Sequence, residues 1–160
     1  LPIYYQQASL ILTQCKSANY NPTFFGCDGL DGLLSIKNFD TSLCEGVMLL
    51  TPFAADAQDQ ATQDFVKKYK DAYKGETPNQ FAADAYDGVM VLAELMKKEG
   101  ITADMSASDI CDKLKKAISD KDFSYDGLTG TGMKWNANGE VSKSPKAVVI
   151  KDGNYAALDN

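Results

Sequence analysis

Short apolar runs alternate along this chain with longer segments in which apolar and polar positions follow a helical period. Four segments have apolar residues at helical spacing and predict helices: residues 6–17, 60–74, 80–99 and 106–118. Three short apolar runs predict strands: residues 1–5, 23–25 and 45–52. The continuous run Val47–Leu50 is typical of a strand buried on both faces of a parallel sheet. This alternation of strands and helices predicts an α/β fold.

The segment 80–99 is the longest predicted helix, and Gly100 ends it. Asp84 and Asp87 are expected at solvated or capping positions on this helix. A short helix is also expected over residues 29–37, where Gly32 weakens it. The apolar stripe of the long helix is expected to face the core and comprises Phe81, Ala85, Tyr86, Val89, Leu92, Ala93 and Met96.

After the last predicted helix the pattern changes to short strand-like segments separated by turn signals. The run Met133–Trp135 predicts a strand, and residues 147–151 and 155–158 predict a hairpin about the turn Asp152-Gly153. The glycines of residues 127–132 resemble a phosphate-binding loop, but no helix follows them, so a hairpin bend is the better interpretation. The C-terminal part of the chain is therefore expected to be antiparallel.

Length and composition are those of one globular domain. The chain has 160 residues, of which 44% are hydrophobic and 24% charged. No run approaches the roughly 20 apolar residues of a membrane span. The net charge of −6 and the pI near 4.6 argue against nucleic acid or an anionic membrane surface as a partner. Because the chain starts inside a predicted strand, we expect a fragment or a processed product, and a missing leader says nothing about export.

The cysteines are widely separated, and the sequence contains no histidine: Cys15, Cys27, Cys44 and Cys111. A zinc site would need all four thiolates from scattered elements. Buried free thiols are the favoured interpretation, with a disulfide left open for an exported protein. A serine or cysteine triad would lack its usual histidine base. We therefore predict no metal site, no cofactor and no catalytic residue.

The strongest candidate for chemistry is the run Thr23–Gly29, which delivers one carboxylate, Asp28, to the end of a predicted strand. Tyr4 and Tyr5 close the preceding apolar stretch. Ligands of open α/β sheets bind at the carboxyl edge of the strands. A carboxylate and a phenol brought together there suit a small cation such as an ammonium group. The glycines on both sides of Asp28 allow the backbone to approach closely.

The order of these motifs resembles the type I periplasmic, or extracellular, solute-binding proteins of the branched-chain amino-acid ABC transporter family. The motifs that carry the resemblance are, in chain order, Gly26-Cys27-Asp28-Gly29, Asp64-Phe65-Val66-x-x-Tyr69-x-x-x-Tyr73, Pro78-Asn79-x-Phe81-Ala82-Ala83-x-Ala85-Tyr86-Asp87, Leu128-Thr129-Gly130 and Val148–Tyr155. The resemblance covers essentially the whole chain, and it matches only the C-terminal half of the family fold.

This resemblance implies a type I periplasmic-binding-protein fold, in which a parallel sheet lies between two layers of helices and a C-terminal antiparallel hairpin follows. Residues 1–52 and 123–160 would be parts of the second lobe. Residues 53–122 would form a crossover and the late helices that return to the first lobe. The N-terminal half of the family fold, which supplies the groups that grip a ligand carboxylate, would be absent.

The resemblance also implies roles for four residues. Asp28 occupies the acidic position of the Gly-x-Asp-Gly motif, which binds the α-ammonium of a ligand. Tyr4 would pack against the ligand with Tyr5 beside it, although strand alternation favours a core position for Tyr5. Phe81 opens the long helix and would line the side-chain pocket.

The implied function is that of an extracellular solute-binding component of an ABC transporter, for branched-chain or other amino acids or related amides and acids. It would bind without catalysis, deliver its ligand to a membrane permease, and be anchored as a lipoprotein at the cell surface or in the periplasm. Because surface normally covered by the absent half would be left apolar, we expect the chain to form a homodimer or to exchange strands.

Two alternative functions are considered. The first is a ligand-sensing receptor or regulatory domain of the same fold. The second is a magnesium-dependent phosphatase that uses Asp28, because Asp28-Gly29-Leu30-Asp31 resembles the haloacid-dehalogenase motif. The second carboxylate comes three positions later instead of two, and no matching lysine region follows, which argues against the phosphatase.

Overall fold

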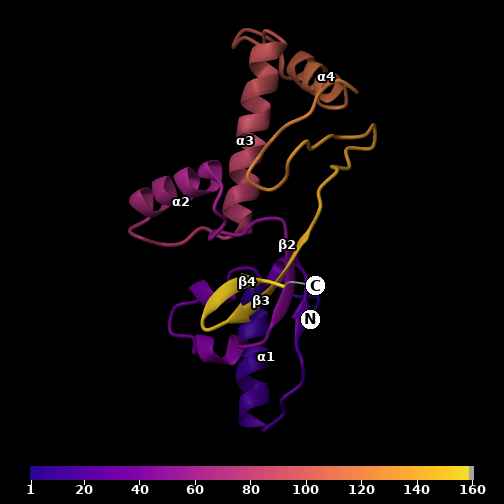
Figure 1. The fold of residues 1–160 in the computed structure, drawn as a ribbon. Coiled ribbons are helices and arrows are strands. Elements are labelled where there is room, and N and C mark those ends of the chain that lie inside the picture. Colours follow the sequence, from indigo (N-terminus) through magenta and orange to yellow (C-terminus); the bar gives the residue numbers. More distant parts are fainter. Residues whose placement is uncertain (159–160) are drawn as a thin grey trace. The chain divides into compact units, whose positions relative to one another are not determined.

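The computed structural model describes residues 1–158, and the chain divides into two compact units (Figure 1). Unit 1 contains Leu1–Gln80 and Pro145–Asn160, and unit 2 contains Phe81–Ser144. The chain therefore passes between the units twice, after Gln80 and after Ser144. The assignment of residues 1–52, 53–122 and 123–160 to the two lobes of a family fold stays a prediction.

Unit 1 holds all the strands that the structure assigns within residues 1–158. Its elements, in chain order, are α1 (Tyr5–Ser17), β1 (Phe25–Gly26), the 3-10 turns η1 (Asp28–Leu30), η2 (Leu33–Ser35) and η3 (Thr41–Cys44), β2 (Met48–Thr51), α2 (Gln60–Ala72), β3 (Lys146–Lys151) and β4 (Asn154–Ala157). Helix α1 and helix α2 confirm the predictions for residues 6–17 and 60–74. Asp59 caps α2, since its carboxylate accepts a hydrogen bond from the Thr62 N–H.

The sheet has the order β1-β2-β3-β4 and is mixed. β1 and β2 are parallel, with Phe25 opposite Met48, whereas β2, β3 and β4 pair antiparallel. The prediction of a strand buried on both faces is wrong for β2, because Leu49 and Thr51 are buried while Met48 and Leu50 are only half-buried. Alternating burial along a strand is typical of antiparallel pairing, in which one face of the sheet packs on the core.

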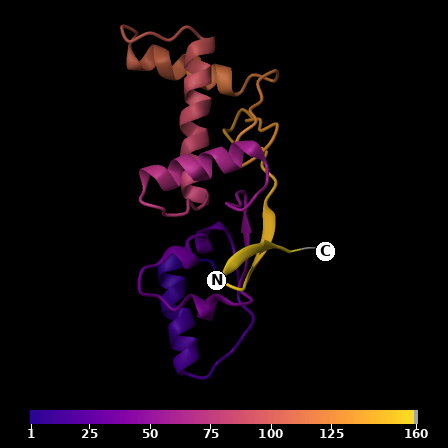
Figure 2. The same cartoon turned by 60° about the vertical axis from the view of Figure 1, so that its left-hand side comes forward.

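The β3–β4 hairpin confirms the antiparallel C-terminal prediction (Figure 2). Asp152 and Gly153 connect its strands with φ values of 51° and 73°. Two successive positive φ angles are the requirement of a type I′ turn, and Asp-Gly is one of the few pairs that adopt them readily.

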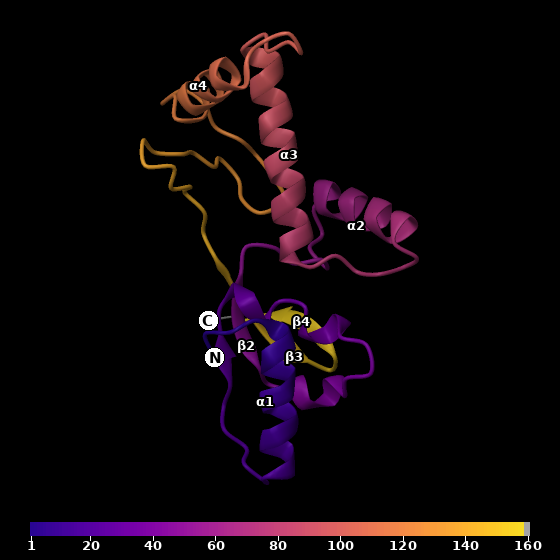
Figure 3. The ribbon, with the colours of Figure 1, turned by 180° about the vertical axis from the view of Figure 1, so that it is seen from behind.

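The core of unit 1 lies between the sheet and α1 (Figure 3). Buried apolar side chains from α1, the 3-10 turns and the strands form one cluster: Ala8, Leu12, Leu30, Leu33, Cys44, Val47, Leu49, Val148 and Ile150. The predicted helix over 29–37 is replaced by the two turns η1 and η2, between which Gly32 has a φ of 116°. That conformation cannot be accommodated inside an α-helix.

Residues 1–4 form no strand, which corrects the prediction for residues 1–5. The nitrogen of Leu1 donates to the carbonyl oxygen of Phe25, but Pro2 has no N–H with which to extend a ladder. Tyr4 is extended and precedes α1 as its N-cap residue, so the helix begins at Tyr5. β1 is also displaced relative to the predicted strand at 23–25 and covers Phe25–Gly26.

Unit 2 consists of most of helix α3 (Gln80–Lys98), helix α4 (Ala107–Ile118) and the segment that leads to Ser144. Its core is formed by Val91, Leu95, Ala117 and Phe123. The predicted strand Met133–Trp135 makes only isolated bridges, with Tyr125 and Val141. The Tyr125–Met133 bridge closes the hairpin bend expected over residues 127–132. Within residues 1–158, the helices lack the combination of length and apolarity that crossing a bilayer would need.

The prediction for the inward face of α3 is wrong. The predicted stripe includes Val89, which is 65% exposed, and Leu92, which is 45% exposed. The buried positions of α3 are instead Gln80, Ala83, Asp87, Val91 and Leu95. Because α3 carries apolar residues on more than one face, the hydrophobic period alone does not identify which face the chain itself covers.

Candidate functional site

Asp28 stands directly after β1, at the carboxyl end of the parallel pair β1–β2. It is the first residue of η1, a turn closed by hydrogen bonds from the Leu30 N–H to the Cys27 oxygen (3.1 Å) and from the Asp31 N–H to the Asp28 oxygen (2.9 Å). The Asp28 side chain is exposed and forms no hydrogen bond or ion pair with residues 1–158. A carboxylate on a hydrogen-bonded turn is therefore presented to solvent at this edge of the sheet.

Gly29 brings the Asp28 turn against the segment that carries Tyr4. A Cβ atom added to Gly29 would lie 2.6 Å from the Ile3 carbonyl oxygen and 3.5 Å from the Tyr4 Cα. A Cβ atom added to Gly26 would lie 2.3 Å from the Leu30 Cδ1 and 3.1 Å from the Leu1 carbonyl oxygen. The expectation that the glycines around Asp28 permit close backbone approach is confirmed.

The two neighbouring tyrosines differ in their surroundings. Tyr4 is 63% exposed, whereas Tyr5 is half-buried and packs against the core cluster of unit 1. The Tyr5 ring lies 3.0–3.1 Å from the place that a Cβ on Gly32 would occupy. The core position expected for Tyr5 is therefore observed, and Tyr4 is the tyrosine that faces solvent beside the Asp28 turn.

Phe81 is the second residue of α3 and is half-buried. It belongs to unit 2, whereas Asp28, Tyr4 and Tyr5 belong to unit 1. Its role as a wall of a pocket that also contains Asp28 stays a prediction.

Sequence reasoning missed a buried polar cluster around Asp31, which follows Asp28 by three residues. Asp31 is only 5% exposed, and its Oδ2 accepts a 2.7 Å hydrogen bond from the backbone N–H of Gln80. The Gln80 Oε1 in turn accepts a 2.9 Å bond from the Thr51 hydroxyl. The Tyr155 hydroxyl accepts from the Gly32 N–H at 3.2 Å. Burial, followed by the negative charge of Asp31, raises the pKa of the Tyr155 phenol.

The sequence signal for this cluster is the Asp28-Gly29-Leu30-Asp31 spacing, which also resembles a phosphatase motif. In the structure the two carboxylates have different environments, since Asp28 is exposed and Asp31 is buried and hydrogen-bonded. A magnesium site of that motif would need both carboxylates to face the same ion. The geometry gives the phosphatase interpretation no support.

Asp87 was expected at a solvated or capping position, and this prediction is wrong. It is 4% exposed and accepts hydrogen bonds from the Leu128 N–H (2.9 Å), the Thr129 N–H (2.9 Å) and the Thr129 hydroxyl (2.7 Å). Asp84 pairs instead with Lys143 at 2.6 Å. Both aspartates of α3 therefore tie the segment after α4 to the helix within unit 2.

The cysteines are free thiols in the structure: Cys15, Cys27, Cys44 and Cys111. Cys44 is buried, and its burial, followed by the charge of Asp40, raises the pKa of its thiol to about 11. Cys27 and Cys111 are exposed and Cys15 is half-buried, so the prediction of buried thiols is confirmed only for Cys44.

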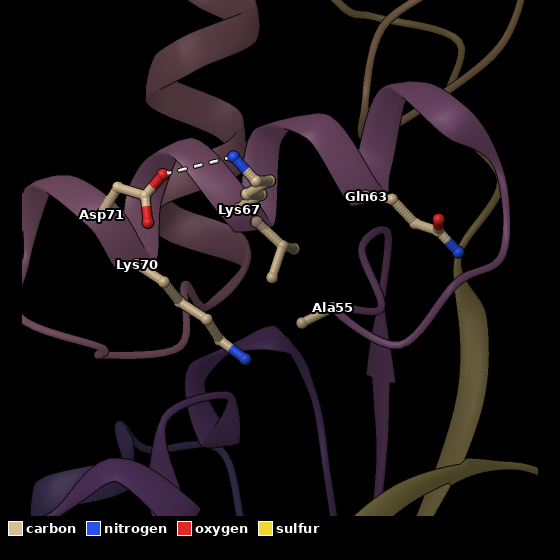
Figure 4. Close-up of a pocket in the computed structure, with 6 residues that line it drawn as sticks. Ala55, Gln63, Lys67, Lys70 and Asp71 are labelled. Carbon is tan, nitrogen blue, oxygen red and sulfur yellow. Dashed lines mark ion pairs between the residues drawn. The ribbon is translucent and has the colours of Figure 1, made fainter.

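A depression of about 340 Å³ lies along α2 in unit 1 (Figure 4). Its walls come from Ala55, Gln63, Val66, Lys67, Lys70 and Asp71. Lys67 and Asp71 form an exposed ion pair at 3.6 Å on successive turns of the helix. None of Asp28, Tyr4, Tyr5 and Phe81 lines this depression, and its charged groups are those of an ordinary solvated helix face.

The family model described as "Periplasmic binding protein" matches residues 3–154. Among solved structures, the branched-chain amino acid transporter substrate binding protein LivJ from Streptococcus pneumoniae in complex with isoleucine is 22% identical, with a TM-score of 0.76 over 98% of this chain. A leucine binding protein LivK from Thermotoga maritima is 23% identical, with a TM-score of 0.73 over 99% of this chain.

A solute binding protein of an ABC transporter from R. palustris, in complex with benzoate, is 20% identical, with a TM-score of 0.75 over 94% of this chain. This chain covers 42%, 42% and 39% of the three structures, respectively. These likenesses therefore establish a shared fold over less than half of each relative. No curated protein matches the sequence significantly.

Proposed function

Because the chain belongs to the periplasmic binding protein family, we propose that it is part of an extracellular solute-binding component of an ABC transporter that binds an amino acid. The structural relatives include proteins in complex with isoleucine and with benzoate. Members of the family bind solutes without catalysis, and the same is proposed for this protein. Delivery to a membrane permease and anchoring as a lipoprotein are parts of the same proposal.

The observation that carries the proposal is the Asp28 carboxylate, exposed and unpaired among residues 1–158 at the carboxyl end of a parallel strand pair. An ammonium group that met this carboxylate in a closed cleft would form a charge-assisted hydrogen bond, which is shorter and stronger than a neutral one. The exposed Tyr4, held beside the Asp28 turn, could add about 0.5–2 kcal/mol of cation–π attraction.

The proposed mechanism is binding without bond making. A ligand held by Asp28 and Tyr4, with Phe81 lining its side-chain pocket, would favour the closed state through the contacts made only there. Since the chain spans about two fifths of the length of its structural relatives, this chain alone is expected to bind amino acids very weakly.

The test is isothermal calorimetry with L-isoleucine and L-leucine on a protein that carries this chain within the full length of its relatives. Asp28→Asn removes the charge and keeps the shape, and affinity is expected to fall at least about tenfold. Asp112→Asn is the matched control, because it removes the same charge from an exposed position on α4. Equal affinity in the wild type and in Asp28→Asn would remove Asp28 from the site.

The second candidate function is a sensing receptor of the same fold, in which ligand-driven closure signals instead of delivering cargo. The site would be the same in both functions, so the binding experiment does not separate them. Loss of amino-acid uptake in cells that lack the protein would support transport, whereas unchanged uptake with a lost response to the amino acid would support sensing.

A further inference from the structure

Asp31 joins three parts of unit 1 that are far apart in the sequence. Its backbone N–H closes η1 on the Asp28 oxygen (2.9 Å), and its Oδ2 accepts from the Gln80 N–H (2.7 Å). The Tyr155 hydroxyl also hydrogen-bonds to the Asp31 carboxylate. The turn that carries Asp28 is thereby connected to the start of α3, 49 residues away, and to β4.

The chemistry of these contacts explains why a charge can be buried here. A buried carboxylate is costly unless hydrogen bonds replace its water. The first N–H groups of an α-helix have no partner within the helix, and they carry the positive end of its dipole. Asp31 supplies an acceptor to the first residue of α3, so each group satisfies the other.

Gln80 is fixed on its side-chain end as well. Its Oε1 accepts from the Thr51 hydroxyl, and that hydroxyl lies within 3.2 Å of the Phe53 N–H, which donates to it. Gln80 is 1% exposed and is the residue at which the chain leaves unit 1. Asp31 is therefore hydrogen-bonded to a buried residue whose side chain is itself hydrogen-bonded within unit 1.

We propose that Asp31 is the positioning residue of the Asp28 turn, which it holds in one conformation by anchoring it to Gln80 and Tyr155. The inference rests on the proposed function, because the position of the turn affects binding only if Asp28 contacts a ligand. Asp31 does not itself touch the ligand in this arrangement, since its carboxylate is buried.

The first experiment uses the 160-residue chain and ¹⁵N NMR. In Asp31→Asn the backbone order parameters of Asp28 and Gly29 are expected to fall, and the Gln80 amide is expected to exchange with solvent at least about tenfold faster. Tyr155→Phe removes the hydroxyl on the other side of the carboxylate and should loosen the same turn to a smaller extent. It also decides the question if Asp31→Asn does not fold.

Asp87→Asn is the matched control, because Asp87 is a carboxylate of nearly equal burial that accepts backbone hydrogen bonds in unit 2. It is expected to destabilise the chain while leaving the Asp28 and Gly29 amides unchanged. Unchanged order parameters in both Asp31→Asn and Tyr155→Phe would overturn the proposal, as would the same loosening of the turn in Asp87→Asn.

The second experiment is L-isoleucine calorimetry on a protein with the full length of the relatives. Affinity is expected to fall about tenfold in Asp31→Asn and to be unchanged in Asp87→Asn. If the wild-type protein binds no amino acid, the proposed function fails, while the NMR comparison still decides whether Asp31 orders the turn. If the wild type binds and Asp31→Asn binds equally well, the positioning role fails and the proposed function stands.

Discussion

The Asp87 carboxylate on α3 accepts hydrogen bonds from both the backbone N–H and the hydroxyl of Thr129, which lies 42 residues further along the chain. A third bond comes from the Leu128 N–H. In the segment after α4, Phe123 and Met133 are buried, and Tyr125 and Met133 form a backbone bridge. The Asp87 carboxylate adds three hydrogen bonds that tie the bend between Tyr125 and Met133 to α3.

Asp87→Ala is expected to destabilise the chain by about 3 kcal/mol, because it leaves the buried Thr129 N–H and hydroxyl and the half-buried Leu128 N–H without an acceptor. Urea unfolding followed by circular dichroism measures this change. Asp112→Ala, on the exposed face of α4, is the control and should stay within about 0.5 kcal/mol of the wild type. A small effect at Asp87 would mean that the loop is ordered by other contacts.

Gly29→Ala and Gly88→Ala are expected to change stability in opposite directions. The added Cβ at Gly29 would lie 2.6 Å from the Ile3 carbonyl oxygen, a backbone atom that cannot move without displacing the residues before α1. A Cβ added to Gly88, within α3, would have no atom within 4 Å apart from its chain neighbours and the backbone of the helix itself. Alanine there should therefore stabilise the helix by up to about 1 kcal/mol.

Thermal unfolding of the two variants measures this contrast, with Gly29→Ala expected below the wild type and Gly88→Ala above it. Equal melting temperatures would contradict the close approach of the Asp28 turn and the segment that carries Tyr4.

The parts of the fold that the sequence predicts well are those fixed by local chemistry. Helix α2 begins at its Asp59 cap, and the β3–β4 hairpin turns at Asp152-Gly153, where few other residue pairs would fit. Asp28 could be selected because two glycines flank it and an apolar run precedes it. Each of these signals lies within a few neighbouring residues.

The parts that were missed depend on residues far apart in the chain. Asp31 and Asp87 look like solvated aspartates until α3 and the loop after α4 are placed against them. The buried face of α3 was misassigned for a related reason. Its apolar residues are spread over more than one face, and only the tertiary structure shows that Val91 and Leu95 are covered while Val89 is not.

The stability of the chain is expected to fall between about pH 9 and pH 11 because of Cys44. Burial raises the pKa of this thiol from 9.0 to about 11. Below pH 9 the thiol is protonated in both the folded and the unfolded chain, so it has no effect. Above pH 9 the unfolded chain loses its proton first, which costs up to about 1.4 kcal/mol of stability for each pH unit.

Urea unfolding at pH 8, 9, 10 and 11 measures how steeply the free energy of unfolding falls with pH. Cys44→Ala is the control in which this fall should become shallower. Tyr155, whose phenol pKa is also raised by burial, adds a loss of the same sign at higher pH in both proteins.

At pH 8 a thiol reagent should label the exposed Cys27 and Cys111 quickly and Cys44 only on unfolding. Rapid labelling of all four cysteines would show that Cys44 is accessible.

The exposed face of α3 gives the homodimer prediction a specific surface, and we propose that a second copy of this chain covers it. Ala85, Val89, Leu92 and Met96 follow one another at intervals of four, three and four residues, which is the seam spacing of paired helices. Val89 and Leu92 are among the more exposed apolar side chains of residues 1–158. A helix with apolar residues on two faces gains burial when another helix packs on the second face.

Light scattering on the 160-residue chain is expected to show a mass that rises toward that of a dimer with concentration. Val89→Glu and Leu92→Glu should shift this rise to at least about tenfold higher concentration, because each would bury an unpaired carboxylate in the seam. Leu10→Glu is the matched control, since Leu10 is a similarly exposed apolar residue on α1, which belongs to unit 1. A monomer at all concentrations would remove the dimer. A dimer that Leu10→Glu weakens and Val89→Glu does not would place the contact on α1 instead of α3.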